Sequence, residues 1–323
     1  IANASVSVLL ALALCLGLRF MPFWVAVEAQ IFDAMTVATA PGRSQLPITI
    51  VGIDEASFTQ LGQRWPWPRD MHARLIDQLV KGGASVIAFD VQFSEAGNAA
   101  EDQALAAAIA RAGNVVLAAD QAYAETGSTR QWLRADPIPA FTSAGALTGL
   151  ATTQLEGDGV IRLVPTAEDA FWRQAIRSLI KARPGAVAEP VVEPGAMLRH
   201  LGPPHTFPFV SYHQVLNGDS KIPPDFFAGQ MVLIGRDVRS SPEIGAAQAD
   251  MFATPFLRTS RLLTPGVEVH ATLIENALMG QTLLPASTAQ NLAVLMVALL
   301  LAWVALVYWH PARSGLVVVM LGG

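Results

Sequence analysis

Cysteine is almost absent from this chain. Its 323 residues include a single cysteine, Cys15, which lies inside an apolar run near the N-terminus. The rest of the sequence therefore has no disulfide framework and no thiolate metal site. A region without cysteine cannot misoxidise outside the cytoplasm, so this composition is compatible with a periplasmic location.

Charged residues are also scarce. They make up 15% of the chain and hydrophobic residues 52%, whereas about a quarter of an ordinary soluble protein is charged. The formal net charge is −5, and no run rich in lysine or arginine occurs. Because binding to a phosphate backbone requires a basic surface, this balance argues against nucleic acid as a partner.

The motifs of the common enzyme classes are missing as well. The chain has no Walker A loop, Gly-rich dinucleotide turn, kinase catalytic loop, G-x-S-x-G motif or H-E-x-x-H motif. His200, His205 and His213 are spaced five and eight residues apart around prolines, which is no recognised zinc pattern. We therefore assign no catalytic residue, no metal ligand and no cofactor to this chain.

The apolar residues are concentrated at the two ends. Residues 1–18 carry no charge and have about the length of a transmembrane helix, and we predict a retained anchor over residues 1–27. A signal peptide is the alternative, because Ala38-Thr39-Ala40 resembles a cleavage site, but this triplet lies far beyond the apolar run. Thr288–Tyr308 is almost wholly apolar and predicts a second transmembrane helix over residues 287–309.

The C-terminal residues predict the orientation. Residues 310–323 read as a tight turn and the start of a further transmembrane segment. Arg313 lies in this turn, and cytoplasmic loops are enriched in arginine and lysine. A cytoplasmic turn places the region between the two predicted membrane helices, residues 28–286, outside the cytoplasm.

The stretch Ile48–Asp70, with the sequence ITIVGIDEASFTQLGQRWPWPRD, organises this middle region. Its β-branched start predicts a buried strand that delivers Asp54 and Glu55 to a loop. Two prolines then stiffen the corner Trp65-Pro66-Trp67-Pro68-Arg69 by fixing their own φ and restricting the residue before them.

Helices and strands alternate after this corner. Asp70 is the expected N-cap of a helix that ends at Gly82-Gly83. The later predicted elements are a strand closed by Asp90, a helix over residues 98–113, a strand closed by Asp120, a strand over residues 231–235 closed by Arg236-Asp237, and a helix over residues 264–280.

This alternation predicts an α/β fold, with a largely parallel sheet covered by helices and flanked by transmembrane α-helices. Residues 150–201 are expected to add an antiparallel part, because Glu156-Gly157-Asp158-Gly159 is a natural hairpin turn. Arg162 is expected to form a structural ion pair with Asp158. Residues 121–140 lack periodicity and hold two prolines, which predicts an exposed excursion.

Five acidic residues follow apolar strands: Asp54, Glu55, Asp90, Asp120 and Asp237. The carboxyl ends of strands in an open α/β sheet gather at one edge, where ligands bind. Carboxylates clustered there can hold a divalent or an organic cation, and we select Asp54, Glu55, Asp90 and Asp237 as candidate ligand-binding residues. The alternative is that these short side chains cap helices and turns.

Trp65, Trp67 and Arg69 are candidates for the same site. The tryptophans can line a binding groove, contact a partner or fill a corner of the core. Arg69 can pair with Asp54 or Asp90. The sequence leaves these alternatives open.

The succession of these motifs resembles one family. GIDEASF, LGQRWPWPRD, GGASVIAFDVQFSE, EGDGVIRLVP, MVLIGRD and TPGVEVHATLIENAL occur in this order between Phe32 and Leu284. Together they resemble the type-two CHASE domain, the extracytoplasmic sensory module of bacterial transmembrane receptors.

The resemblance implies a multi-pass receptor in the bacterial cytoplasmic (inner) membrane, whose periplasmic or extracellular sensor responds to an unknown signal. The implied output beyond Gly323 is a class III adenylate cyclase that makes cyclic AMP, with a histidine kinase or another kinase as the alternative. ATP and a divalent metal are expected only in that output domain. A homodimer is expected because both leading outputs work as dimers.

The resemblance also assigns signal coupling to the segments that join the sensor to its membrane helices. These segments carry Asp33 on the N-terminal side, and Glu268 and His270 on the C-terminal side. Two other functions stay open: a membrane-anchored, metal-dependent hydrolase that uses the strand-end carboxylates, and a structural scaffold that recruits a protein partner.

Overall fold

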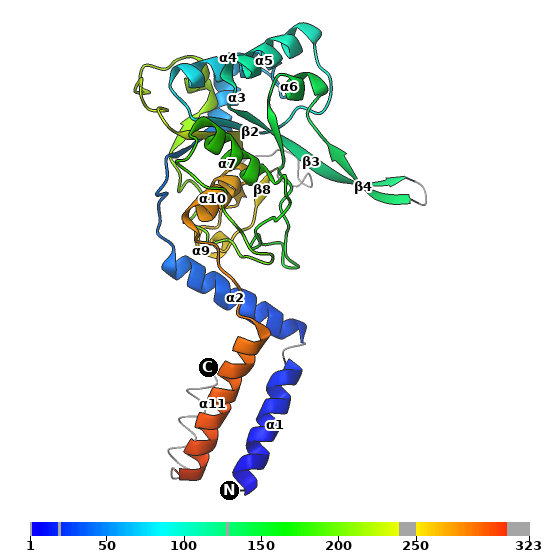
Figure 1. The fold of residues 1–323 in the computed structure, drawn as a ribbon, viewed down its shortest axis with the longest axis vertical. Coiled ribbons are helices and arrows are strands. Elements are labelled where there is room, and N and C mark those ends of the chain that lie inside the picture. The colour runs from blue at the N-terminus through cyan, green and yellow to red at the C-terminus, as the bar shows by residue number, and fades with distance from the viewer. Residues whose placement is uncertain (1, 19–20, 127–128, 239–249, 309–323) are drawn as a thin grey trace. The chain divides into compact units, whose positions relative to one another are not determined.

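The computed structural model describes residues 2–18, 21–126, 129–238 and 250–308. The chain divides into two compact units. One consists of residues 1–35 together with 284–323, and the other, which we call the α/β unit, of residues 36–283. Figure 1 shows the chain coloured from the N-terminus to the C-terminus.

The first unit is built from apolar helices. These are α1 (Ala2–Leu18), most of α2 (Pro22–Thr39) and α11 (Thr288–Tyr308), and α1 packs against α11. Among the described residues, one helix is long and apolar enough to cross a membrane, over the window Thr288–Ala305. Ser287 and Gln290 form the reciprocal cap at the start of α11. The predicted turn at residues 310–323 lies outside the described residues.

The α/β unit is organised around a seven-stranded sheet. Its strands run in the spatial order β4-β3-β2-β7-β1-β6, and β5 also pairs with β3. All pairs are parallel except β3 with β4. The strands are β1 (Ile48–Asp54), β2 (Val86–Gln92), β3 (Val115–Thr126), β4 (Thr129–Ala135), β5 (Leu147–Leu150), β6 (Phe209–Ser211) and β7 (Met231–Asp237).

Strand β7 lies between β1 and β2. It pairs with β1 along its whole length, and with β2 so that Asp90 is opposite Gly235. All three strands are apolar on both faces, as expected for parallel strands that are covered on both sides. Their carboxyl ends therefore meet at the same edge of the sheet.

Helices cover both faces of this sheet, and each face has its own core. Side chains of β1 alternate between the two cores, with Val51 and Ile53 in one and Ile48 and Ile50 in the other. Figure 1 shows α4 and α5 on one side of the sheet and α7 and α10 on the other. The first face carries α3 (Glu55–Leu61), α4 (Arg69–Lys81), α5 (Ala99–Ala112), α6 (Pro139–Ser143) and α8 (Tyr212–Leu216), and the second carries α7 (Phe171–Ala182) and α10 (Gly266–Met279).

The smallest elements follow β7. These are β8 (Met251–Phe252), α9 (Leu257–Ser260) and β9 (Thr264–Pro265), and β8 pairs with β9. Helix α10 therefore begins at Gly266, directly after β9. Helix α4 begins at Arg69, so Asp70 lies in its first turn rather than at the N-cap. The predicted α/β fold with a largely parallel, helix-covered sheet is confirmed.

The one antiparallel strand pair of the seven-stranded sheet lies outside residues 150–201. Strand β3 does not end before Asp120 but continues to Thr126 and returns as β4, and this hairpin projects from the sheet (Figure 1). The predicted exposed excursion over residues 121–140 is confirmed for residues 131–134, which are exposed. Its regular pairing was not predicted: the register places Tyr123 opposite Trp132 in a ladder of backbone pairs.

Residues 150–201 contribute a turn but no hairpin. Gly159 donates its amide to the carbonyl of Glu156 and has a φ of +80°, so the predicted turn is confirmed. Beyond the turn, Leu163 and Met197 form an antiparallel bridge, so residues 150–201 contribute the predicted antiparallel part as an isolated bridge rather than as a hairpin. Ile161 donates to the carbonyl of Ala253 and Val164 to that of Ala196.

Candidate functional site

A cavity of about 900 Å³ lies at the carboxyl ends of β2 and β7 and beside residues 118–120 in the middle of β3. We call it the carboxylate pocket, because Asp90, Asp120 and Asp250 line it. Its other lining residues include the corner Trp65–Arg69, residues 91–97 after β2, Thr152 and Thr153 after β5, Arg236 of β7, and Phe252 of β8. The predicted edge of the sheet thus carries a cavity.

Asp90 is the most deeply buried acid of this pocket. Its side chain is 8% exposed, and its Oδ2 has no hydrogen-bond partner among the described residues. Burial, and then the negative charge of Asp120, raise the pKa of Asp90 to about 7. At neutral pH this carboxyl therefore exchanges between its charged and uncharged forms.

Asp120 is a satisfied carboxylate. It accepts hydrogen bonds from the Gln92 side chain at 2.7 Å, from the Thr152 hydroxyl at 2.8 Å and from the backbone amide of Gln121 at 2.7 Å. These three donors fix the orientation of the Asp120 carboxylate. The charge on Asp120 is therefore held in place beside Asp90.

Asp250 approaches the pocket from the segment before β8, with a φ of +72°. Burial and the charge of Asp90 raise its pKa to about 9, while Arg236 acts in the opposite direction. Helix α10 begins against this residue: the Gly266 amide donates to the Asp250 carbonyl at 2.8 Å. A Cβ at position 266 would overlap the Asp250 carboxyl, so only glycine allows this approach.

Aromatic side chains form the other wall. The rings of Trp65 and Trp67 lie 5.5 Å apart, and Trp67 also packs on Tyr212 at 4.8 Å. Trp67 is 3% exposed and belongs to the core, whereas Trp65 is half-buried at the pocket. The two tryptophans of the corner thus lie in different surroundings.

Arg69 holds this corner to its neighbours. Its guanidinium pairs with Asp102 and donates to the carbonyl of Glu95, and its backbone amide donates to Glu101 at 3.0 Å. The predicted pairing of Arg69 with Asp54 or Asp90 was wrong, because α5 brings two closer carboxylates to it. Arg69 therefore orients the loop that borders the pocket.

The remaining candidates lie outside the carboxylate pocket. Asp54 caps α3 by accepting from the backbone amide of Ser57 at 2.8 Å, and Glu55 is the first residue of that helix. Asp237 lies 2.6 Å from His205 Nε2. Successive side chains of a strand point to opposite faces, which is why Arg236 reaches the pocket and Asp237 does not.

The predicted coupling residues occupy three different environments. His270 of α10 lies 3.9 Å from Asp90 and against the ring of Phe171 at 4.9 Å, and burial lowers its pKa to about 4 despite a backbone hydrogen bond with Ala151. Glu268 accepts from the backbone amides of residues 205 and 206, both at 2.8 Å, and burial raises its pKa. Asp33 is buried on α2.

The comparison with protein families decides the identity of the fold. The model of the CHASE2 domain matches residues 8–308. The chain belongs to the CHASE2 domain family. CHASE2 domains are sensory extracellular domains of signalling receptors, so the predicted resemblance and the sensor role are confirmed. No curated protein and no solved structure matches the chain.

Several pocket residues of this CHASE2 domain were not selected from the sequence. Asp250 and Arg236 belong to this group, as do Gln92 and the pair Thr152-Thr153. Two threonines directly after a short apolar strand are a signal that could have been used. Asp250 follows a segment without periodicity, so no local pattern indicates it.

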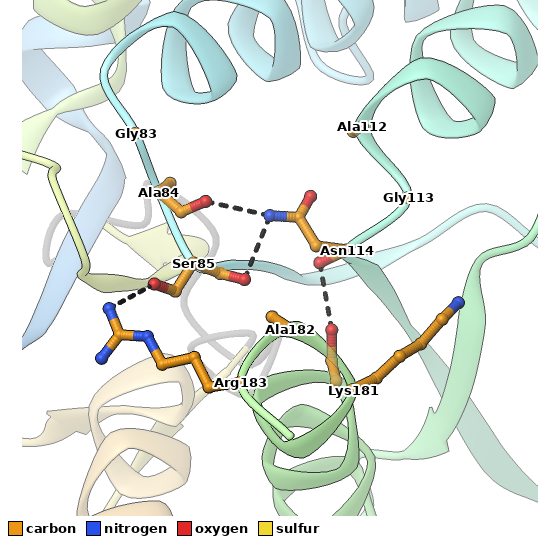
Figure 2. A pocket seen from close by; sticks show the side chains of 10 residues that line it. Gly83, Ala84, Ser85, Ala112, Gly113, Asn114, Lys181, Ala182 and Arg183 are labelled. Carbon is orange, nitrogen blue, oxygen red and sulfur yellow. Dashed lines mark hydrogen bonds between the residues drawn. The ribbon is translucent and has the colours of Figure 1, made fainter. Parts of the chain in front are cut away.

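A second cavity, of about 400 Å³, lies at the opposite edge of the sheet (Figure 2). Its polar groups form hydrogen bonds between elements of the domain. The Asn114 side chain donates to the carbonyls of Ala84 and Ser85, and Arg183 donates to the Ser85 hydroxyl at 2.9 Å. In the described part of the chain, no group of three or more histidine, cysteine or acidic residues could hold a metal ion.

Proposed function

We propose that this CHASE2 domain senses a small molecule in the carboxylate pocket and regulates a cytoplasmic adenylate cyclase beyond Gly323. The observation that supports a ligand most strongly is the buried Oδ2 of Asp90, which lines a large cavity and has no partner among the described residues. A buried polar atom without a partner is costly, and a ligand that pairs with it recovers that free energy.

Helix α10 supports the coupling step. Its first turn contacts the pocket, since Gly266 lies against Asp250 and His270 lies beside Asp90. Farther along the helix, the Asn276 side chain pairs with the backbone of Arg199, accepting at 2.8 Å and donating at 3.0 Å. A shift of the pocket acids can therefore move one rigid helix along its length.

Arg199 supports a link between the two places where the chain enters and leaves the α/β unit. Its guanidinium donates to the carbonyl of Thr39, the last residue of α2, at 3.4 Å. It also donates to the side chain of Gln281, just after α10, at 3.2 Å. Nearby, Met197 and Leu283 exchange two backbone hydrogen bonds.

The segment 197–201 thus fastens both ends of the α/β unit to each other. A ligand shifts such an arrangement between two states only by as much as its affinity for them differs. We propose that this segment converts pocket occupancy into a relative movement of the two connecting segments. Asp33 on α2, and Glu268 and His270 on α10, would act in the same step.

The receptor context completes the proposal. We propose a multi-pass protein of the bacterial inner membrane that acts as a homodimer, with ATP and its metal ion bound only by the output domain. A histidine kinase output is the alternative. The support for these assignments is the receptor family to which the domain belongs.

The test uses membranes that carry the full-length gene product, incubated with labelled ATP. We expect cyclic AMP, and we expect Asp90→Asn to change its basal rate because the substitution fixes position 90 in an uncharged form. Asp77→Asn, on the outer face of α4 and 2.9 Å from Arg111, is the matched control and should leave the rate unchanged. Phosphate retained on the protein would indicate a kinase output instead of a cyclase. The absence of both cyclic AMP and phosphoprotein would contradict both outputs.

A further inference from the structure

Three buried side-chain atoms of residues that line the carboxylate pocket have no partner among the described residues: Asp90 Oδ2, the Thr153 hydroxyl and Arg236 Nε. The first two indicate what a ligand can offer as a donor. Asp90 Oδ2 is an acceptor whenever the carboxyl is ionised, and the buried Thr153 hydroxyl also has no partner among the described residues. Both residues line the same cavity. A group that donates several hydrogen bonds at once would satisfy them together.

The charges around the pocket are unbalanced toward the negative. The acidic lining residues are Asp90, Asp120, Asp250, Glu95 and Glu101, and the basic ones are Arg69 and Arg236. The guanidinium of Arg69 is already paired with Asp102, which lies outside the lining. Arg236 faces Asp250, which keeps its proton at neutral pH because its pKa is about 9. The negative charge inside the cavity therefore comes from Asp120 and from Asp90 when it is ionised.

An apolar surface accompanies these charges. Trp65, Phe93 and Phe252 line the cavity beside the acids. A tryptophan face attracts a cation as well as an apolar group. The cavity thus combines carboxylates with aromatic side chains, which favours a cation that carries an apolar group over an anion.

We propose that the carboxylate pocket binds a small organic cation, whose primary ammonium group lies among Asp90, Asp120 and Asp250 and whose apolar body lies against Trp65. This inference rests on the proposed role of the pocket as the sensing site. An ammonium group supplies three donors and one positive charge, which match the unpaired acceptor of Asp90 and the carboxylate of Asp120 beside it.

Binding of such a cation is coupled to protons. The groups that face Asp90 are Asp120 from β3, Asp250 from the segment before β8, Arg236 from β7 and the neutral His270 from α10. Because the pKa of Asp90 is about 7 in the free domain, the cation must displace its proton at lower pH. The affinity is therefore expected to rise about tenfold from pH 6 to pH 8, with release of about one proton at pH 6.

The experiment is isothermal titration of the full chain in detergent micelles with phenethylamine, which stays protonated over this pH range as lysine does. Phenethyl alcohol and 3-phenylpropionate are the neutral and anionic probes of similar size. Titration in two buffers of different ionisation enthalpy counts the protons released. Mg²⁺ and Ca²⁺ are titrated separately.

We expect the amine to bind at least tenfold more tightly than either analogue. Asp90→Asn should weaken it by about 10- to 100-fold, as expected for loss of one charge-assisted hydrogen bond, and should abolish the proton release. Asp250→Asn serves as the second variant and should weaken the amine less than Asp90→Asn does, because Asp250 keeps its proton over this pH range. Asp77→Asn, outside the pocket, should change the dissociation constant less than twofold.

Three results would overturn the proposal. One is the absence of a binding heat for the amine at millimolar concentration. Another is equal affinity for the amine and the alcohol, which would make the pocket a site for neutral ligands. The last is binding of Mg²⁺ or Ca²⁺ that is lost in Asp90→Asn and competes with the amine, which would make it a metal site.

The outcome is separable from that of the proposed function. Titration requires no output domain, and the basal cyclic AMP rate of Asp90→Asn requires no ligand. If the pocket does not bind amines but Asp90→Asn changes the output, the proposed sensor role stands and only the proposed ligand class is refuted. If amines bind but no cyclic AMP forms, the ligand class stands and the cyclase output is refuted.

Discussion

Replacing Asp90 by asparagine removes a carboxyl whose ionisation opposes folding. In the folded domain its pKa is raised from 3.8 to about 7 by burial and by Asp120. Between these two values the native state holds a proton that the unfolded state has lost. The stability of the wild-type protein must therefore fall as the pH rises from about 4 to about 7, and it remains lowered above that range.

The magnitude follows from the shift. One pKa unit corresponds to about 1.4 kcal/mol, so Asp90 alone lowers the free energy of unfolding by about 2.5 kcal/mol between pH 5 and pH 8. For a domain of this size the loss corresponds to about 5–10 °C in Tm. The Asp90→Asn variant has no ionisable group at position 90, so position 90 causes no loss of stability between pH 5 and pH 8.

The informative quantity is the difference between variant and wild type as a function of pH. The asparagine amide has no partner in the pocket, which costs about 1–3 kcal/mol at every pH and cancels from this comparison. Removing the charge of Asp90 also relieves Asp250, whose pKa is raised in part by that charge. The effect on Asp250 also favours the variant at high pH. The stability difference between variant and wild type should therefore change by at least about 2.5 kcal/mol from pH 5 to pH 8.

The assay is thermal unfolding of the full chain in detergent micelles, followed by tryptophan fluorescence at pH 5, 6.5 and 8. Asp77→Asn, at a half-exposed carboxylate 2.9 Å from Arg111, is the control and should parallel the wild type. A difference between Asp90→Asn and wild type that is constant within about 0.5 kcal/mol from pH 5 to pH 8 would refute the burial of Asp90 and the electrostatics of the pocket.

Three further predictions concern other side chains of the domain. Trp67→Ala should destabilise the α/β unit by about 3–5 kcal/mol in chemical denaturation, because Trp67 is 3% exposed, whereas Trp65→Ala should cost less than half as much and weaken amine binding in the titration. Arg162→Met should lower the free energy of unfolding by about 1–3 kcal/mol, because the Arg162 side chain is 2% exposed and pairs with two carboxylates of its turn. Arg111→Met removes an exposed ion pair and should change it by no more than about 0.5 kcal/mol. Equal losses in the two variants would contradict this prediction. Arg199→Met should preserve amine affinity but reduce the change in cyclic AMP that the amine produces, and an unchanged response would remove the segment 197–201 from the coupling step.

The sequence by itself determined the local elements of this CHASE2 domain. The β-branched run that closes at Asp54 forms β1, and Asn98 and Gly113 cap the two ends of α5 as their side-chain and backbone chemistry predicts. The turn at residues 156–159 and the ion pair of Asp158 with Arg162 were predictable for the same reason. Each depends on contacts within a few residues, which a local pattern encodes.

Only the tertiary structure decided which strand-end acids share a pocket. Insertion of β7 between β1 and β2 separates Asp54 from Asp90, and Asp54 is used as a helix cap. The same insertion brings Arg236 to the pocket, while a segment without periodicity adds Asp250. The order of strands depends on how the helices cover the two faces of the sheet, and no short stretch of sequence carries that information.

The β3–β4 hairpin is a second feature that no local sequence pattern indicates. Its polar residues look irregular when counted along the chain, yet they pair across the two strands in a regular register. Local periodicity reports which side of an element is buried against a core. It cannot reveal a hairpin such as β3–β4, which is ordered by backbone pairing, because almost every residue type carries the same backbone donor and acceptor.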